Sequence, residues 1–173
     1  MRIAERPSSA RAFALLCGGL LAGAFGYGAV NVLYAFREVP LDVRFTFHTA
    51  LMSVNGVVMQ SLMGLTILST LVLAARATGR SRLLAGAASV LAAAAFLLTR
   101  LGNVPINQKI KVWTVSGPPA DYADLLGRWE AFHFARTACA LVAFLLVVLT
   151  TLRPAKEARR TRSARLTTVA GDH

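Results

Sequence analysis

Glu130 and His133 stand three residues apart in an apolar stretch, and this E-x-x-H spacing is the one with which di-iron helical bundles hold their metals. A di-iron centre needs a second such pair and two further carboxylates, and no other acidic residue falls inside the long apolar stretches. The sequence therefore argues against a di-iron site. His48, Glu130 and His133 together would match the two-histidine, one-carboxylate set of mononuclear non-haem iron, and this metal site stays open as an alternative. A haem between the two histidines is weaker still, because no motif supports it.

Other polar residues recur at helical spacing within the apolar stretches. Trp129, His133 and Arg136 follow one another at intervals of four and three residues, which places them on one helix face. Polar residues are costly inside a membrane and usually face the interior of a helix bundle, so they are the default functional candidates. We expect the sets to converge on one pocket; the remaining members are His48 and Asn55, Tyr27 and Asn31, and Arg100 and Asn103.

Each candidate also has a structural interpretation. Trp113 and Trp129 fit an aromatic belt at the membrane interface, and Asn31 and Asn55 fit interhelical hydrogen bonding. Arg136 lies inside a span and needs a partner, which we expect to be a carbonyl of segment 103–107 or a ligand, because Glu130 does not share its helix face. A catalytic role predicts that His133 and Arg136 face a cavity, whereas a structural role predicts that they are packed and fully paired.

The composition indicates what positions these residues. Of 173 residues, 55% are hydrophobic and only 16% charged, against about 25% charged in an average soluble domain. Apolar stretches over about 12–36, 48–75, 83–101 and 125–152 are each long enough to cross a bilayer. We therefore predict an all-α integral membrane four-helix bundle over residues 1–152. A signal peptide is the competing interpretation of the first stretch, which its unbroken apolar length disfavours.

The basic residues predict the orientation. Twelve lysines and arginines lie in the N-terminal tail, the second connection and the tail 153–173, against six in or next to the first and third connections, where Arg100 and Arg128 flank the third. The positive-inside rule then places both termini and the basic tail in the cytoplasm, and a long Pro-rich loop over 102–124 outside. We expect a multi-pass protein of the cell membrane. The net charge of +11 is explained by this topology, so nucleic acid is not an expected partner.

Small residues indicate how the helices pack. Gly19 and Gly23 in the first stretch, and Ala85, Ala88 and Ala92 in the third, recur at helical spacing and allow close approach of another helix. Packing within the bundle is the favoured interpretation, and a homo-oligomer is the alternative. The cysteines, Cys17 and Cys139, form no CxxC or metal-spaced cluster and act as small apolar residues.

Two motifs resemble those of the anthrone oxygenase family, a group of four-helix membrane proteins. They are the N-x-P-x-N segment from Asn103 to Asn107, and the W-x-x-x-H-x-x-R-T segment from Trp129 to Thr137. The resemblance is strongest over about 100–143. It implies oxidation of an anthrone, a tricyclic polyketide, to the anthraquinone by molecular oxygen as co-substrate, with no cofactor expected and a metal not excluded.

The resemblance also implies roles for the candidate residues. His133 or His48 would be the base, Arg136 would stabilise the oxyanion, Asn103 and Asn107 would orient the substrate, and Trp129 and Trp113 would stack on its rings. The alternative is a noncatalytic membrane protein that binds a lipid, a quinone or a partner protein. A transporter is disfavoured, because the sequence has neither inverted repeats nor broken helices.

Overall fold

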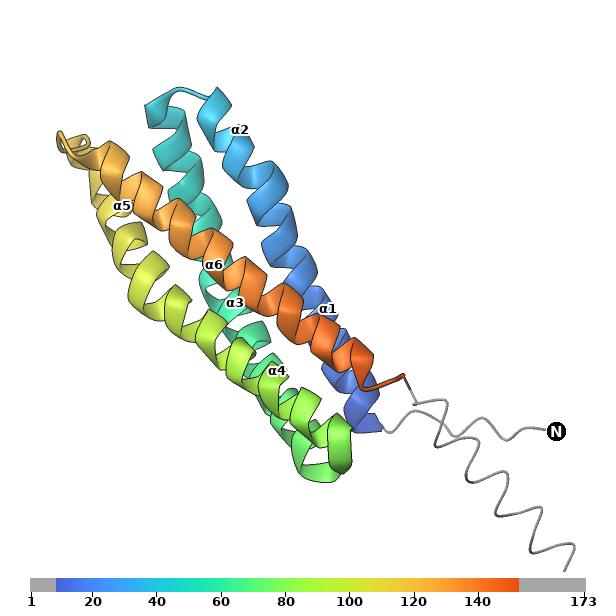
Figure 1. The fold of residues 1–173 in the computed structure, drawn as a ribbon. Helices are drawn as coiled ribbons and strands as arrows, with labels where there is room; N and C mark the ends of the chain where they lie inside the picture. The colour runs from blue at the N-terminus through green and yellow to red at the C-terminus, as the bar shows by residue number, and fades with distance from the viewer. Residues whose placement is uncertain (1–8, 153–173) are drawn as a thin grey trace, which may run out of the picture.

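Four long apolar helices make up the part of the chain that the computed structural model describes, residues 9–152 (Figure 1). Each is long and apolar enough to cross a membrane, and the described residues contain no strand. This confirms an all-helical fold for residues 9–152, and its four long apolar helices are compatible with the predicted membrane bundle. The first span consists of α1 (Ser9–Tyr27), η1 (Gly28–Val32) and α2 (Leu33–Glu38); the second is α3 (Leu41–Arg76); the third consists of α4 (Gly79–Leu98), η2 (Thr99–Asn103) and α5 (Val104–Ser116); the fourth is α6 (Tyr122–Leu149).

The connections between the spans are short. The chain turns at residues 39–40, 77–78 and 117–121, and Gly79 and Gly117 begin or follow a helix with φ of 54° and 78°, values that glycine adopts without steric cost. Figure 1 shows the start of α1 and the end of α6 at the same end of the bundle, beside the turn between α3 and α4. Both ends of the described chain therefore lie on one side of the bundle.

The prediction of a Pro-rich loop over 102–124 is wrong, because helix α5 occupies most of these residues. The third span continues as helix to Ser116, and only residues 117–121 form the connection. Pro105 lacks an N–H and would interrupt a regular α-helix, but the wider turn η2 comes immediately before it, with Val104 N–H bonded to the carbonyl of Thr99. Local π-type turns of this kind accommodate proline within membrane helices.

The predicted orientation stays a prediction. Eight of the twelve basic residues assigned to the cytoplasmic side lie in the segments 1–8 and 153–173, including the whole basic tail, and these segments are outside the described residues. The second span begins at Leu41, seven residues before the predicted start at His48, so Arg44 lies within a helix and not in a connection.

Small residues let the helices pack closely at the end of the bundle away from α2 and α5. Ala85, Ala88, Ala92 and Ala95 are all fully buried along α4, which packs between α3 and α6. In α1, Gly18 and Gly19 lie against Phe144 of α6. These stripes therefore serve packing within the bundle, as expected. Gly23 differs, because nothing lies within 4 Å of the position its Cβ would take.

The two π-helical turns bring their spans close to α6. Gly102 in η2 is so near α6 that a Cβ there would lie 2.5 Å from the ring of Phe132, and a Cβ on Gly28 in η1 would lie 3.1 Å from the ring of His133. Phe132 and His133 are consecutive in α6, so the fourth span passes between the two π turns. Such turns are often found at functional sites.

Candidate functional site: a polar cavity among the four spans

A cavity of about 480 Å³ lies between the four spans at the level of the two π turns. Its size is within the range of about 300 to 1,000 Å³ that is common for small-molecule sites. Its wall is largely apolar, with a few polar groups contributed by each span. The polar and ionisable side chains that line it are Tyr27, Asn55, Gln60, Thr99, Arg100, Asn107, Gln108, Trp129, His133 and Arg136.

Four rings contact one another in a row, and three of them, Phe36, Trp129 and His133, also line the cavity. Phe36 of α2 stacks on His48 of α3 with centroids 5.2 Å apart, and His48 meets the ring of Trp129 edge-on at 4.7 Å. Trp129 then lies parallel to His133, with centroids 5.4 Å apart and an interplanar angle of 2°. The two candidate histidines therefore both contact Trp129, whose flat ring forms part of the cavity wall.

Asn107 fixes the protonation of His48. The indole N–H of Trp129 donates to Asn107 Oδ1 at 2.7 Å, and His48 Nε2 lies 3.0 Å from the same oxygen. Because an indole N–H can only donate, the atom that it meets must be the amide oxygen, and His48 Nε2 must carry a proton to donate to it. The lone pair of neutral His48 is then on Nδ1, which is buried and has no hydrogen-bond partner among the described residues.

Arg136 fixes the tautomer of His133, with its lone pair on Nδ1 bonded rather than unshared. Its Nε and Nη2 lie 3.1 Å and 2.8 Å from His133 Nδ1. A guanidinium has only donors, so Nδ1 accepts and the proton of neutral His133 is on Nε2. That nitrogen is buried against the backbone of Gly28, and no hydrogen bond of standard geometry satisfies it within residues 9–152.

Arg136 is buried, and its remaining contacts are uncharged. Its Nη1 donates to Thr99 Oγ1 at 3.3 Å, and its guanidinium carbon lies 4.5 Å from the centroid of the Phe25 ring. Neither the carbonyls of segment 103–107 nor Glu130 is a partner of this arginine in the structure. A cation-π contact and neutral acceptors stabilise the guanidinium but leave its charge uncompensated.

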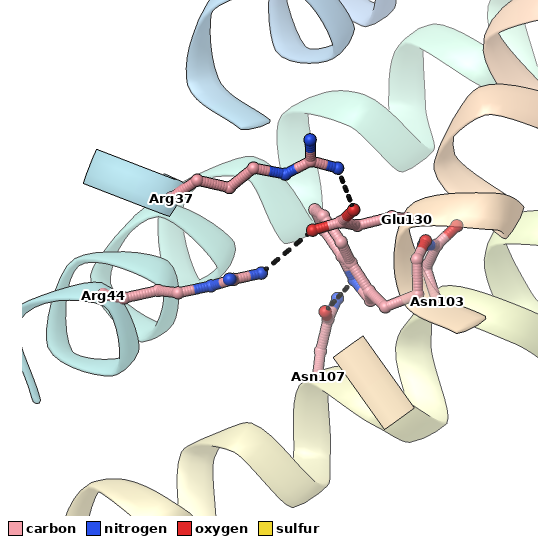
Figure 2. A network of polar contacts seen from close by, with 6 residues as sticks. Arg37, Arg44, Asn103, Asn107 and Glu130 are labelled. Carbon is pink, nitrogen blue, oxygen red and sulfur yellow. Dashed lines mark hydrogen bonds and ion pairs between the residues drawn. The ribbon is translucent and has the colours of Figure 1, made fainter. Parts of the chain in front are cut away.

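Glu130 is held by two arginines at one end of the bundle (Figure 2). Arg37 of α2 donates to Oε2, and Arg44 of α3 donates to Oε1 at 3.3 Å. Figure 2 also shows Asn103 and Asn107 next to this pair of contacts; Asn103 is fully buried and donates its Nδ2 to the backbone carbonyl of Trp129 at 2.9 Å. The carboxylate of Glu130 thus joins the first and second spans to the fourth.

The alternative metal site over His48, Glu130 and His133 does not fit this arrangement. Both oxygens of Glu130 are engaged by arginines, and His133 Nδ1 accepts from Arg136. Within the described residues, no three histidine, cysteine or acidic side chains are grouped closely enough to hold a metal ion. We therefore derive no chemistry through a metal at these residues.

The structure brings together most of the residues that the sequence predicted as a site. Six of them line the cavity: Tyr27, Asn55, Asn107, Trp129, His133 and Arg136. His48 and Asn103 lie directly behind the wall, bonded to Asn107 and to Trp129. Trp113 is instead buried next to Phe45, and Asn31 lies on the exposed surface of η1; neither lines the cavity.

Several contributors had no recognised signal in the sequence. Gly28 leaves room for His133, Thr99 accepts from Arg136, and Phe25 lies under the guanidinium. Arg37 and Arg44 were interpreted only as charges of a connection. Their position at the same end of the spans as Glu130 could have indicated the ion pairs, because a buried carboxylate needs a partner.

Together, the fold and site define a small multi-pass membrane protein with a ligand-sized cavity lined by hydrogen-bond donors and a flat indole. Comparison with known families gives the assignment: the family model described as anthrone oxygenase matches residues 47–146. The chain belongs to the anthrone oxygenase family. The matched stretch includes His48, Asn107 and the segment from Trp129 to Arg136. No curated protein and no solved structure matches the sequence significantly.

Proposed function

We propose that this protein oxidises an anthrone-like aromatic polyketide to a quinone with molecular oxygen inside the membrane. The observation that carries the proposal is that His133 and Arg136 both line a ligand-sized cavity between the four spans. Family membership supports the reaction type. The indole ring of Trp129 in the cavity wall supports a flat aromatic substrate, because aromatic rings stack favourably on one another.

The reaction needs little beyond a base, an anion site and access for oxygen. Loss of a proton from the central methylene gives an anion whose charge lies largely on the carbonyl oxygen. The anion passes one electron to O₂, and the carbon radical and superoxide combine into a peroxide at that carbon, which takes up a proton. Loss of water then breaks the O–O bond and the remaining C–H bond and leaves a second carbonyl. One O₂ is consumed and one H₂O released per substrate.

The contacts of the two histidines support different roles for them. The lone pair of neutral His133 on Nδ1 accepts from Arg136, so Nε2 carries the proton and cannot act as a base. His48 has an unshared lone pair on Nδ1, which makes it the proposed proton acceptor. It lies behind Phe36 and Trp129, which both line the cavity, so the proposed transfer needs a bridging water or a shift of these two rings. Asn107 also lines the cavity, and its amide N–H₂ is the proposed donor to substrate hydroxyls.

The surroundings proposed for this reaction are a lipid bilayer and a hydrophobic aromatic substrate. We propose the cell membrane, with both termini in the cytoplasm as the basic residues predict, and a place in polyketide biosynthesis. A homo-oligomer stays open.

The test is oxygen uptake and product formation by the detergent-purified protein with emodin anthrone. Autoxidation without protein is the baseline, and the metal content of the same sample is measured. We expect protein-dependent quinone formation that is lost in Arg136→Met and His48→Leu. The matched control is Arg128→Gln, an exposed arginine two turns earlier on the same helix, which should leave turnover unchanged. A rate equal to autoxidation would refute the proposal and favour noncatalytic binding of a lipid, a quinone or a partner protein.

A further inference from the structure

We propose that a groove on the outer surface of the bundle, between the end of α3 and the start of α4, binds one anionic phospholipid. An acyl chain would lie in the groove, and the phosphate of the headgroup would lie at Arg82. The groove shares no lining residue with the cavity described above. The inference therefore goes beyond the proposed function and does not rest on it.

The groove is a second hollow of about 480 Å³, next to the turn at residues 77–78. Small residues of both helices leave this space open: Ala74 and Ala75 of α3, and Gly86 and Ala87 of α4. Leu71 and Leu83 also line the groove, and they are 51% and 75% exposed. The wall is thus apolar and open to the surroundings of the bundle, where a hydrocarbon chain gains van der Waals contacts.

One end of this apolar groove is cationic. Arg82 is the charged residue that lines it, and it is the lining residue of α4 nearest the turn. Arg76 and Arg80 flank the same turn, and all three arginines are exposed. The ion pairs found within residues 9–152 involve other arginines. A guanidinium binds phosphate well, and basic side chains between membrane helices are typical of sites for anionic headgroups.

The acidic residues of the described chain lie elsewhere. No aspartate or glutamate occurs in the sequence between Asp42 and Asp121. These two belong to the ends of helices at the turns 39–40 and 117–121, which Figure 1 shows at the opposite end of the bundle from the turn between α3 and α4. Glu130 is held by its own pair of arginines. An anion at Arg82 therefore meets attraction, and no carboxylate of residues 9–152 competes with it.

The charge also decides among the possible occupants of the groove. The segment 153–173 carries six basic and two acidic residues, so the arginines at the turn would repel it. A second copy of the chain in a two-fold contact would bring both copies of Arg82 into one interface. A phospholipid without net charge would leave the arginines uncompensated. An anionic phospholipid matches both the apolar length of the groove and its cationic end.

The experiment is native mass spectrometry of the full chain in detergent, titrated with dioleoyl-phosphatidylglycerol or dioleoyl-phosphatidylcholine. The two lipids share their acyl chains and differ in headgroup charge. One arginine near an anionic headgroup contributes about fivefold in affinity. We expect the first phosphatidylglycerol to bind at least about fivefold more tightly than phosphatidylcholine, and Arg82→Gln to reduce this preference about fivefold. Arg128→Gln, an exposed arginine at the other end of the bundle, should keep it.

Variants of Gly86 test the place of the acyl chain separately. A Cβ on Gly86 meets no atom within 4 Å, so Gly86→Leu fills the groove without a clash. It should weaken both lipids several-fold and leave the headgroup preference unchanged. Gly64→Leu is the matched control, because Gly64 of α3 is equally open and lines neither the groove nor the cavity. Gly86→Ala should give a smaller loss and keeps the test decisive if Gly86→Leu does not fold.

Each outcome supports or overturns the proposal. Equal affinity for the two lipids overturns it, and so does a loss of preference in Arg128→Gln as large as that in Arg82→Gln. Equal binding by Gly86→Leu and Gly64→Leu would place the chain elsewhere and overturn it as well. Inorganic phosphate that displaces phosphatidylglycerol at the same concentration would leave a phosphate site and refute the lipid site. A dimer that separates in Gly86→Leu would make the groove an interface between copies and refute the lipid site too.

Discussion

Gly28 offers a direct test of how tightly His133 is held. A Cβ at this position would lie 3.1 Å from Cε1 and Nε2 of His133, closer than carbon and nitrogen atoms normally pack. The ring cannot easily move away, because it is bonded to Arg136 on one edge and lies parallel to Trp129. We therefore predict that Gly28→Ala displaces His133 by a few tenths of an ångström and strains the site.

The magnitude follows from comparison with a matched glycine. Overpacking by one methyl group lowers the free energy of unfolding by about 1 to 3 kcal/mol. The higher helix propensity of alanine raises it by about 0.8 to 1 kcal/mol relative to glycine. Gly23→Ala carries only the second effect, since nothing lies within 4 Å of its Cβ position. The difference between the two variants thus isolates the overpacking. For a chain of this size it corresponds to a melting temperature about 2 to 12 °C lower for Gly28→Ala than for Gly23→Ala.

The chain contains its own reporter of unfolding. Cys17 is a buried free thiol that becomes reactive when the bundle opens, so thermal unfolding can be followed with a thiol-reactive dye in a Cys139→Ala background. The same pair of glycine variants is then measured with His133→Ala added, which removes the clash. If the difference between Gly28→Ala and Gly23→Ala persists without the His133 ring, or is absent with it, the proposed contact is refuted.

Two further predictions concern groups that hold the site in place. Glu130→Gln should lower the free energy of unfolding by about 1 to 3 kcal/mol, because buried Arg44 loses a charged acceptor. Arg37→Gln should have little effect, since that arginine is exposed. The melting temperatures of the two variants test this, and equal losses of stability would contradict it. Asn107→Leu should lower the free energy of unfolding by about 1 to 3 kcal/mol for each N–H donor, of Trp129 and of His48, that it leaves without an acceptor. Asn107→Asp keeps the acceptor. Unfolding followed by indole fluorescence compares the stability of the two variants, and equal stability would rule out the hydrogen-bond argument.

The four spans were predictable because each is an uninterrupted apolar stretch of sufficient length, and the cavity was predictable because polar residues recur at helical spacing within those stretches. The same spacing placed His133 and Arg136 on one face, where they bond to each other. The partners of Arg136 were not predictable, because no polar pattern in the sequence distinguishes Thr99 and Phe25 from packing residues.

The third span shows where sequence reasoning fails. Pro105 and Gly102 indicated a break, since each weakens an α-helix, but a π turn absorbs both and the helix continues to Ser116. A π turn has no reliable sequence signal, because it depends on contacts made by the neighbouring span. The family resemblance implied that Trp113 stacks on the substrate, and the helical register of α5 instead directs it towards Phe45.

The π turns also determine how this chain tolerates changes in length. A π turn holds one residue more than the corresponding α turn, and each residue of an α-helix advances by about 100°. Deleting a single residue from η2 would let the third span become a regular α-helix while the residues after it keep their faces, because an α turn closes with one residue fewer. Deleting a residue of the regular helix just before Asn107 would instead rotate Asn107 by about 100° and break its hydrogen bond with Trp129. Natural variation in length is therefore expected at residues 117–121 and at the π turns, and not within the regular helices that carry the site.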